Sequence, residues 1–320
     1  MMIVLAVLST ALLPLILLLA LIADIVRYAL RRIPFALSRL AVLGWFYTVT
    51  SVAALGALFV VWLITAFGLW RGPFVRMTFG LQTWWAHQLF AAVLFVMGME
   101  LTVEGEEAIT PGPILVFMRH ASIADVALPN VIVTRRHKVR LKYVLKRELL
   151  LDPAIDIAGN RIPNYFVRRG SADAAGEIAR VGALTDDLAE NEGVIIYPEG
   201  TRFSAAKRQR ILERLRETKP DLAERAEHLH HTLPPRFGGP SALLDTHTPA
   251  DVVFLAHVGF DGMAEVRDLL GGGLVGASIE VGFWRVPYHH VPREPDERLR
   301  WLFDQWERVD AWIGARKAPA

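Results

Sequence analysis

Three long apolar runs fill most of the first hundred residues, and they constrain the fold more than any other feature of the sequence. The first run, residues 1–23, is nearly unbroken and long enough to cross a bilayer. Its start has no charge and its apolar core is too long for a signal peptide, so we predict a retained helix. The second run covers residues 40–67 and the third covers residues 81–99.

The third run leaves two arrangements open. It carries Gln82, His87 and Gln88 among its aromatic residues, so it either spans the bilayer or lies in the interface with its tryptophans at headgroup level. The loop before the second run holds four arginines and the loop after it holds two, which predicts a cytoplasmic first loop. A spanning third run would return the rest of the chain to the cytoplasm, whereas a flat one would leave it outside.

Composition excludes several classes of protein and of site. The formal net charge of +2 is too small to indicate a nucleic-acid partner. The chain has no cysteine, which excludes disulfides, cysteine–zinc sites and thiol nucleophiles. With 320 residues, there is room for one large domain beside the apolar region.

From residue 101 onward, short apolar segments alternate with helix-like segments. We expect strands at residues 114–118, 139–145, 164–167, 194–197, 252–257 and 279–286, and helices at 172–191, 204–231 and 298–313. This alternation predicts an α/β fold with a mostly parallel central sheet flanked by helices, preceded by an N-terminal membrane-helix region. We therefore expect membrane-anchoring helices at residues 1–100 and a catalytic domain at residues 101–320.

Charged residues follow three of the predicted strands. "RHASIAD" (119–125) follows the first, "RR" (168–169) ends the segment "NYFVRR", and "PEGTR" (198–202) follows "VIIY". Ligands of such sheets gather outside the carboxyl ends of the strands. The sequence therefore predicts a site where these three segments meet.

His120 and Asp125 are the candidates for chemistry. A neutral imidazole can take a proton from a hydroxyl, and a carboxylate on the other ring nitrogen holds its tautomer. Alternatively, Ser122 and Asp125 fit a capping box that begins a helix. The two interpretations agree if His120 lies in the turn and Asp125 in the helix.

The segment Glu199 to Arg202 is either a polar surface turn or an anion clamp. Arg202 offers a fork that matches phosphate, Gly200 allows a close backbone approach, and Thr201 is a further donor. We expect Glu199 to hold an arginine or a substrate hydroxyl rather than the anion itself.

Other cationic groups lie near the same predicted edge. Arg168 and Arg169 are either a solvated pair or phosphate contacts, and Lys146 invites the same interpretation with less force. The histidines at 228, 230 and 231 favour a solvated helix end over a metal site, because no carboxylates stand at ligand spacing.

In their order along the chain, "RHASIAD", "YFVRR" and "PEGTR" resemble the sequence blocks of the glycerophospholipid acyltransferase family, which includes the lysophosphatidic acid acyltransferases. The segments "VLKRELLLDPAIDIAGN" and "HTLPPRFGG" resemble its lysocardiolipin- and lysophosphatidylinositol-type branch. The resemblance covers most of residues 101–320. Three features beside the site depart from the family pattern: Arg119 stands where an asparagine is common, Ala121 stands in place of a larger polar residue, and no aromatic residue follows Asp125.

The resemblance implies a role for each block. His120 would be the general base and Asp125 its partner, while Arg169 and the segment Glu199, Gly200, Thr201 and Arg202 would bind the acceptor phosphate. Further substrate contacts are expected from Arg119, Ser122, Lys146, Arg168, Pro235 and Arg236. The family also implies an acyl donor on coenzyme A or acyl carrier protein, a lysophospholipid acceptor, and no metal or other cofactor.

We therefore expect a membrane-bound acyltransferase that acylates the free hydroxyl of a lysophospholipid, foremost 1-acyl-glycerol-3-phosphate, to give phosphatidic acid. We expect a bacterial inner-membrane protein with its catalytic domain on the cytoplasmic side. Two alternatives remain: a membrane-associated lipid ester hydrolase that uses the same His–Asp pair, and a non-catalytic lipid-binding module.

Overall fold

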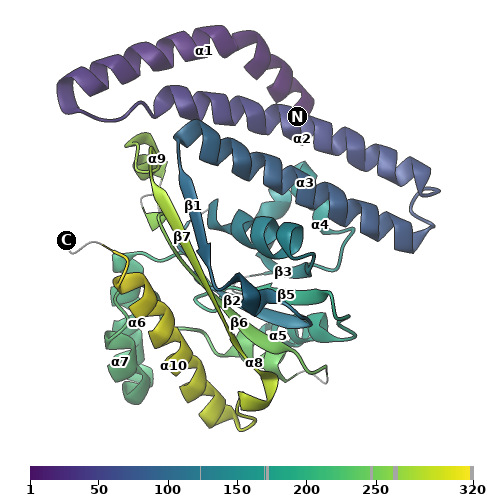
Figure 1. Ribbon diagram of the computed structural model, residues 1–320, viewed down its shortest axis with the longest axis vertical. Helices are drawn as coiled ribbons and strands as arrows, with labels where there is room; N and C mark the ends of the chain where they lie inside the picture. The colour runs from purple at the N-terminus through teal and green to yellow at the C-terminus, as the bar shows by residue number, and fades with distance from the viewer. Residues whose placement is uncertain (123, 169, 171–172, 246–247, 262–265, 318–320) are drawn as a thin grey trace.

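Three long helices form the N-terminal part of the chain: α1 (Met2–Arg31), α2 (Leu37–Ile64) and α3 (Arg71–Met97). In the computed structural model they lie side by side above an α/β domain, with α3 nearest the sheet and α1 farthest from it (Figure 1). The structure describes residues 1–122, 124–168, 170, 173–245, 248–261 and 266–317.

Among these residues, α1 and α2 are the two helices that are long and apolar enough to cross a membrane. Asp24 of α1 is fully buried and fixes the turn between them. Its carboxylate accepts hydrogen bonds from the backbone N–H groups of Leu37 and Ser38, at 3.1 and 2.9 Å. These otherwise unpaired donors at the start of α2 are thereby satisfied.

Most of the third apolar run lies within α3, which packs on the α/β domain. Phe90 and Met97 of α3 are 3 % and 2 % exposed and belong to the same apolar core as the strands. α2 also touches the domain, because the Leu58 carbonyl accepts a hydrogen bond from Arg161 Nη1 at 2.7 Å. Most of the third run is therefore part of a helix that packs on the α/β domain.

A seven-stranded sheet lies below α3 in the described part of the chain, with the order β1-β7-β6-β2-β5-β3-β4. Its strands are β1 (Glu100–Glu104), β2 (Ile114–Met118), β3 (Arg140–Lys146), β4 (Tyr165–Val167), β5 (Glu192–Ile196), β6 (Asp251–Val258) and β7 (Ser278–Val286). Strands β6 and β7 run antiparallel, and every other neighbouring pair is parallel. The mostly parallel α/β fold predicted from the sequence is confirmed.

Helices cover both faces of the sheet. They are α4 (Pro153–Gly159), α5 (Ala174–Gly182), α6 (Ala205–Thr218), α7 (Pro220–Glu227), α8 (Gly238–Leu244), α9 (Val266–Leu270) and α10 (Pro295–Gly314). α3 and a π-helical turn, η3 (Asn130–Arg136), cover one apolar core, and α10 with α5 to α8 covers the other. Strand β2 lies between the two cores, and each of its residues is buried.

Several predicted elements differ from the observed ones for local reasons. The helix expected at 204–231 is two helices, because Pro220 cannot follow a helical residue without a clash and Lys219 is extended. The helix expected at 172–191 ends at Gly182 and continues as a single 3-10 turn, η5 (Ala183–Thr185). Strand β1, which alternates between exposed and half-buried residues, was not predicted.

Candidate active site

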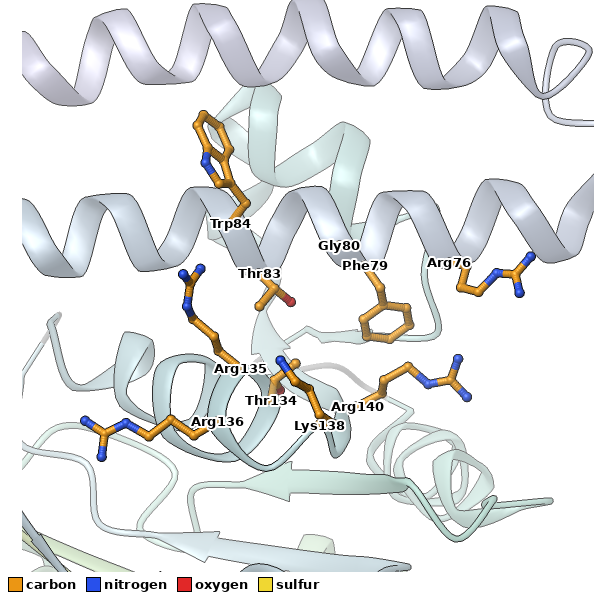
Figure 2. A pocket seen from close by; sticks show the side chains of 10 residues that line it. All are labelled: Arg76, Phe79, Gly80, Thr83, Trp84, Thr134, Arg135, Arg136, Lys138 and Arg140. Atoms are coloured by element: carbon orange, nitrogen blue, oxygen red, sulfur yellow. The ribbon is translucent and has the colours of Figure 1, made fainter.

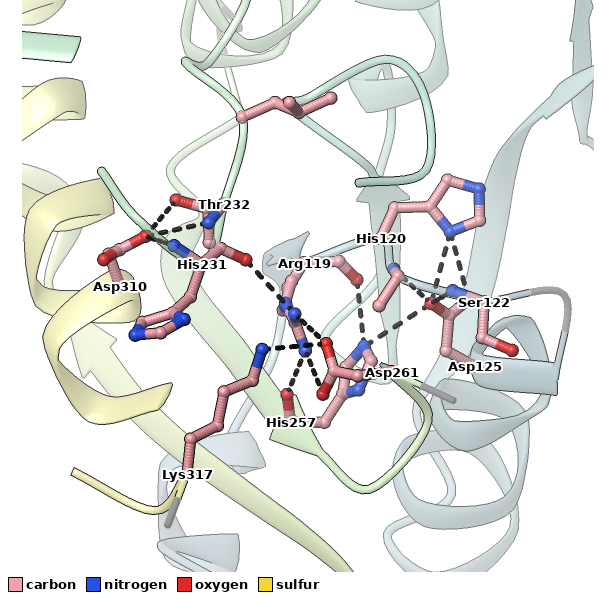
Figure 3. A network of polar contacts seen from close by, with 12 residues as sticks. Arg119, His120, Ser122, Asp125, His231, Thr232, His257, Asp261, Asp310 and Lys317 are labelled. Carbon is pink, nitrogen blue, oxygen red and sulfur yellow. Dashed lines mark hydrogen bonds and ion pairs between the residues drawn. The ribbon is translucent and has the colours of Figure 1, made fainter. Parts of the chain in front are cut away.

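His120 and Asp125 meet at the carboxyl end of β2. The chain leaves the strand at Met118, turns through residues 119–122 and enters a 3-10 turn, η2 (Ala124–Ala127), that carries Asp125. His120 Nδ1 lies 3.1 Å from Asp125 Oδ1 and 3.3 Å from Oδ2 (Figure 3). The arrangement with histidine in the turn and aspartate in the helical segment agrees with the sequence interpretation.

Asp125 is held by more than His120. Its Oδ2 accepts hydrogen bonds from the backbone N–H groups of Ala121 and Ser122, both at 2.7 Å. The Ser122 hydroxyl in turn accepts a hydrogen bond from the Ala124 N–H at 3.1 Å. Asp125 therefore both caps the turn with Ser122 and pairs with His120, so the two sequence interpretations hold together. Ser122 is fully buried, and we assign it to this turn rather than to the substrate.

A second histidine contacts the same carboxylate. His257, on β6 and fully buried, places Nε2 3.5 Å from Asp125 Oδ2 and 3.3 Å from the Arg119 carbonyl. Burial alone raises the pKa of the Asp125 carboxyl, but hydrogen bonds from His120 and His257 outweigh burial and hold this pKa well below its usual range. Asp125 is therefore an anion at neutral pH.

This anion determines the tautomer of His120. A carboxylate can only accept hydrogen bonds, so Nδ1 of the neutral imidazole carries the proton and Nε2 is left as an acceptor. The His120 side chain is 12 % exposed, and Figure 3 shows Nε2 on the side of the ring away from Asp125. The pair is thus arranged as a general base with its accepting nitrogen at the open side of the site.

Glu199 connects the two main sequence blocks. Its Oε1 accepts from the His120 backbone N–H and its Oε2 from the Leu233 N–H, both at 2.9 Å. Burial raises the pKa of Glu199 to about 8, against the opposing effect of these hydrogen bonds. Glu199 is 1 % exposed, so its carboxyl group positions the backbone and does not contact substrate. This corrects the role in phosphate binding that the resemblance implied. It also corrects the expectation that Glu199 holds an arginine or a substrate hydroxyl.

The rest of the "EGTR" segment lies beside His120. The Phe203 N–H donates to the His120 carbonyl at 2.9 Å, so the two loops are joined on both sides of the histidine. Gly200 has a φ of 66°, in the left-handed region that suits glycine, and a Cβ there would lie 2.9 Å from Arg236 Cδ. The Arg236 N–H donates to the Pro198 carbonyl at 2.8 Å. The Pro-Arg segment expected from the resemblance therefore packs on this loop.

Lys207 is a cation that sequence reasoning missed. From the first turn of α6, its Nζ donates to Thr201 Oγ1 at 3.3 Å and to the Arg202 carbonyl at 3.0 Å. Lys207 lies six residues after Thr201 along the chain, and its side chain reaches the loop only because α6 folds back onto this loop. The loop thus combines Arg202, Lys207 and the exposed Arg236 beside the candidate base.

Arg119 is not available to substrate, which corrects the sequence prediction. Its guanidinium is fully buried and donates to Asp261 Oδ1 at 2.5 Å, to the His257 carbonyl at 2.7 Å and to the His231 carbonyl at 3.1 Å (Figure 3). Burial raises the pKa of Asp261, but the Arg119 guanidinium outweighs burial and lowers this pKa to about 2. Arg119 therefore ties β2 to the loops after β6 and α7.

The other predicted residues that the structure describes lie at the same edge of the sheet. Lys146 ends β3 and is paired in register with Val167 of β4. Arg168 follows β4 and is exposed, and its N–H donates to Glu177 at 3.1 Å. Pro235 is buried. Arg169 lies outside the described residues.

Tyr197 is a further residue that the sequence did not single out. It follows β5, and its ring centroid lies 4.6 Å from that of His120. Its hydroxyl is buried and has no hydrogen-bond partner among the described residues. Neither Tyr197 nor His257 stands at an informative spacing from His120 along the chain, so the fold alone brings them to the site.

A mostly parallel sheet that presents an imidazole, oriented by a buried carboxylate, at its carboxyl edge is typical of an enzyme that uses general-base catalysis. Within the described residues, no cluster of histidine and acidic side chains is placed to hold a metal ion. Residues 100–237 match the protein-family model described as Acyltransferase.

The chain is also similar to a solved structure, the 1-acyl-sn-glycerophosphate (LPA) acyltransferase PlsC from Thermotoga maritima. The two are 14 % identical, the match covers 84 % of this chain and 100 % of that chain, and the TM-score is 0.49. The comparison with curated proteins gave no match.

Proposed function

We propose that this protein is a membrane-bound O-acyltransferase that moves a fatty acyl group from an acyl thioester to the free hydroxyl of a lysophospholipid. The donor is a fatty acyl thioester of coenzyme A or of acyl carrier protein. The acceptor is 1-acyl-glycerol-3-phosphate, which becomes phosphatidic acid. The observation that carries the proposal is the hydrogen bond of 3.1 Å between His120 Nδ1 and Asp125, which leaves Nε2 as the accepting nitrogen.

The reaction needs one base and no covalent enzyme intermediate. His120 Nε2 takes the proton of the acceptor hydroxyl while the oxygen attacks the thioester carbonyl. Asp125 stabilises the imidazolium that forms. The carbon–sulfur bond then breaks, the new ester keeps the acyl group, and the imidazolium returns its proton to the leaving thiolate.

The cations beside His120 supply the positioning. Arg202 and Lys207, with the backbone at Gly200 and the hydroxyl of Thr201, form a short segment suited to a phosphate monoester. A phosphate held there brings the acceptor hydroxyl near Nε2, and such positioning lowers the barrier by removing translational freedom in advance. Residues 1–100 would keep the site at the bilayer that contains both acceptor and product.

Acyl transfer in membranes that contain the expressed protein tests this proposal. Radiolabelled acyl-CoA or acyl carrier protein is offered with a panel of lysophospholipids, and His120→Ala membranes serve as the blank. We expect a labelled diacyl product with lysophosphatidic acid that is absent from the blank. Release of free fatty acid without a diacyl product would favour the hydrolase instead, and binding of the lipids with no turnover from either donor would favour the lipid-binding module.

A further inference from the structure

A cavity of about 620 Å³ lies between α3 and the segment that joins η3 to β3. Figure 2 shows Phe79 and Thr83 approaching it from α3, and Arg135 and Lys138 approaching it from the opposite side. Trp84 also lines it. Arg140, the first residue of β3, also lines it. The cavity is therefore at the amino ends of the parallel strands, whereas His120 follows the carboxyl end of β2.

The lining is strongly cationic. Five basic side chains contribute to it, and no acidic residue is among the described residues that line it: Arg76, Arg135, Arg136, Lys138 and Arg140. Two of these charges are already neutralised, since Arg136 pairs with Glu106 at 2.7 Å and Arg140 with Glu192 at 3.0 Å. No carboxylate in the described part of the chain pairs with the other three.

A buried hydroxyl in the same cavity also lacks a partner. Thr134 is 9 % exposed, and its Oγ1 has no hydrogen-bond partner within the described residues. Leaving a buried hydroxyl unpaired is costly, so a ligand atom that accepts its proton is favoured. Thr134 lies in a π-helical turn, a rare geometry that often occurs at functional sites.

The walls of the cavity favour a lipid headgroup over a soluble anion. Trp84, a lining residue, is 41 % exposed, and Phe79 provides an apolar surface beside the cations. Tryptophan and cationic side chains together are characteristic of the headgroup level of a bilayer. α3 packs directly on α2, one of the two helices with the length and apolarity of a membrane span.

We propose that this cavity binds the phosphate headgroup of an anionic phospholipid of the surrounding bilayer, as a site separate from the one that contains His120. Arg76, Arg135 and Lys138 supply the charge, and the Thr134 hydroxyl donates to a phosphate oxygen. The bound lipid orients the domain on an anionic membrane and is not consumed.

Native mass spectrometry of the full-length protein in a neutral detergent tests this site. The probes are phosphatidylglycerol and phosphatidylcholine with the same acyl chains, offered in equal amounts. We expect retention of phosphatidylglycerol in preference to phosphatidylcholine, and a loss of this preference on the order of tenfold in the variant Arg135→Gln/Lys138→Gln.

Two controls make the result specific. Arg210→Gln/Arg214→Gln removes the same charge from the exposed face of α6 and should retain phosphatidylglycerol like the wild type. His120→Ala should also retain it, because His120 lies at the other edge of the sheet. Loss of binding in His120→Ala would place the lipid in the candidate active site and overturn the proposal, whatever the outcome of the acyl transfer assay.

A third arm distinguishes the source of the phosphate. Inorganic phosphate at the concentration of the lipid should not displace phosphatidylglycerol, because it lacks the contacts with Trp84 and Phe79. Displacement of phosphatidylglycerol by inorganic phosphate would indicate that the site binds a soluble phosphate compound, and it would contradict the assignment to a lipid. Retention of phosphatidylglycerol by the Arg135→Gln/Lys138→Gln variant at the wild-type level would contradict the site itself.

Discussion

At the scale of single residues, Asp125 organises the candidate site. Its carboxylate joins two backbone N–H groups, His120 and His257, and each contact favours the ionised form. The sequence predicted the first histidine because His120 and Asp125 are separated by four residues and share a strand end. It could not predict His257, which reaches the carboxylate only because β6 lies beside β2 in the sheet.

Asp125→Asn should abolish most of the activity. An asparagine amide can donate to His120 Nδ1, which would move the imidazole proton to Nε2 and remove the accepting nitrogen. We expect kcat to fall on the order of 10³-fold with little change in KM. Steady-state kinetics of the purified protein measure this, and an Asp125→Asn enzyme with nearly wild-type kcat would rule out the proposed role of Asp125.

His257 should act on the rate through Asp125 and not through substrate. Replacing His257 by Phe removes a donor to the carboxylate at similar volume, so we expect kcat to fall on the order of tenfold while KM stays unchanged. His257→Gln, which restores a donor, should recover part of the loss. An increase in KM alone would show that His257 contacts substrate instead.

The ion pair between Arg119 and Asp261 should make folding sensitive to acid. The folded-state pKa of Asp261, about 2, lies below the usual 3.8, so the stabilisation is complete above about pH 4 and is lost as pH falls toward 2. Asp261→Asn should lower the free energy of unfolding by about 2 kcal/mol near neutral pH. The difference from wild type should shrink as pH falls, and thermal unfolding in detergent between pH 3 and 7 measures it. A difference that is constant with pH would contradict this assignment.

At the scale of elements, the site depends on loops that hold one another. The "RHAS" turn and the "EGTR" loop are joined through Glu199 and through the Phe203 N–H, and the Pro-Arg segment packs on Gly200. Sequence spacing predicted that these segments share a sheet edge, because they follow parallel strands. The contacts between them depend on backbone atoms, which leave no signal in the sequence.

Gly200→Ala tests the packing of these loops. A Cβ at a φ of 66° is strained by about 1–2 kcal/mol, and here it would also meet Arg236. We expect lower stability and lower activity than in Gly276→Ala, a position with a φ of 72° where a Cβ meets no atom within 4 Å. Thermal unfolding and acyl transfer of both variants measure the difference. Equal effects of the two substitutions would show that the contact with Arg236 has no part in the site.

The N-terminal helices show what periodicity could and could not predict. The sequence predicted three apolar segments in the right places, but it left the third between two arrangements. Phe90 and Met97 are as apolar as residues facing lipid, and the fold buries them in the domain core. Hydropathy measures how apolar a side chain is, and it does not show whether lipid or protein surrounds that side chain.

At the scale of the whole molecule, the surface of α1 is the least compatible with water. Leu8, Leu15 and Leu19 are each more than half exposed, and the burial of such side chains in lipid is strongly favoured. We expect the protein to stay with membranes through a high-salt wash, which removes proteins held by charge alone. Release by salt would contradict an apolar anchor, and sedimentation followed by immunoblotting measures the outcome.

The central claim is that His120 deprotonates a lysophospholipid hydroxyl for attack on an acyl thioester. Its most direct test is thiol release from acyl-CoA by the purified full-length protein, with and without lysophosphatidic acid, in the wild type and in His120→Ala. We predict thiol and phosphatidic acid in equal amounts, only when the acceptor is present, and a decrease on the order of 10³-fold in His120→Ala with an unchanged unfolding temperature. Acceptor-dependent transfer at nearly the wild-type rate in a folded His120→Ala protein would contradict the claim.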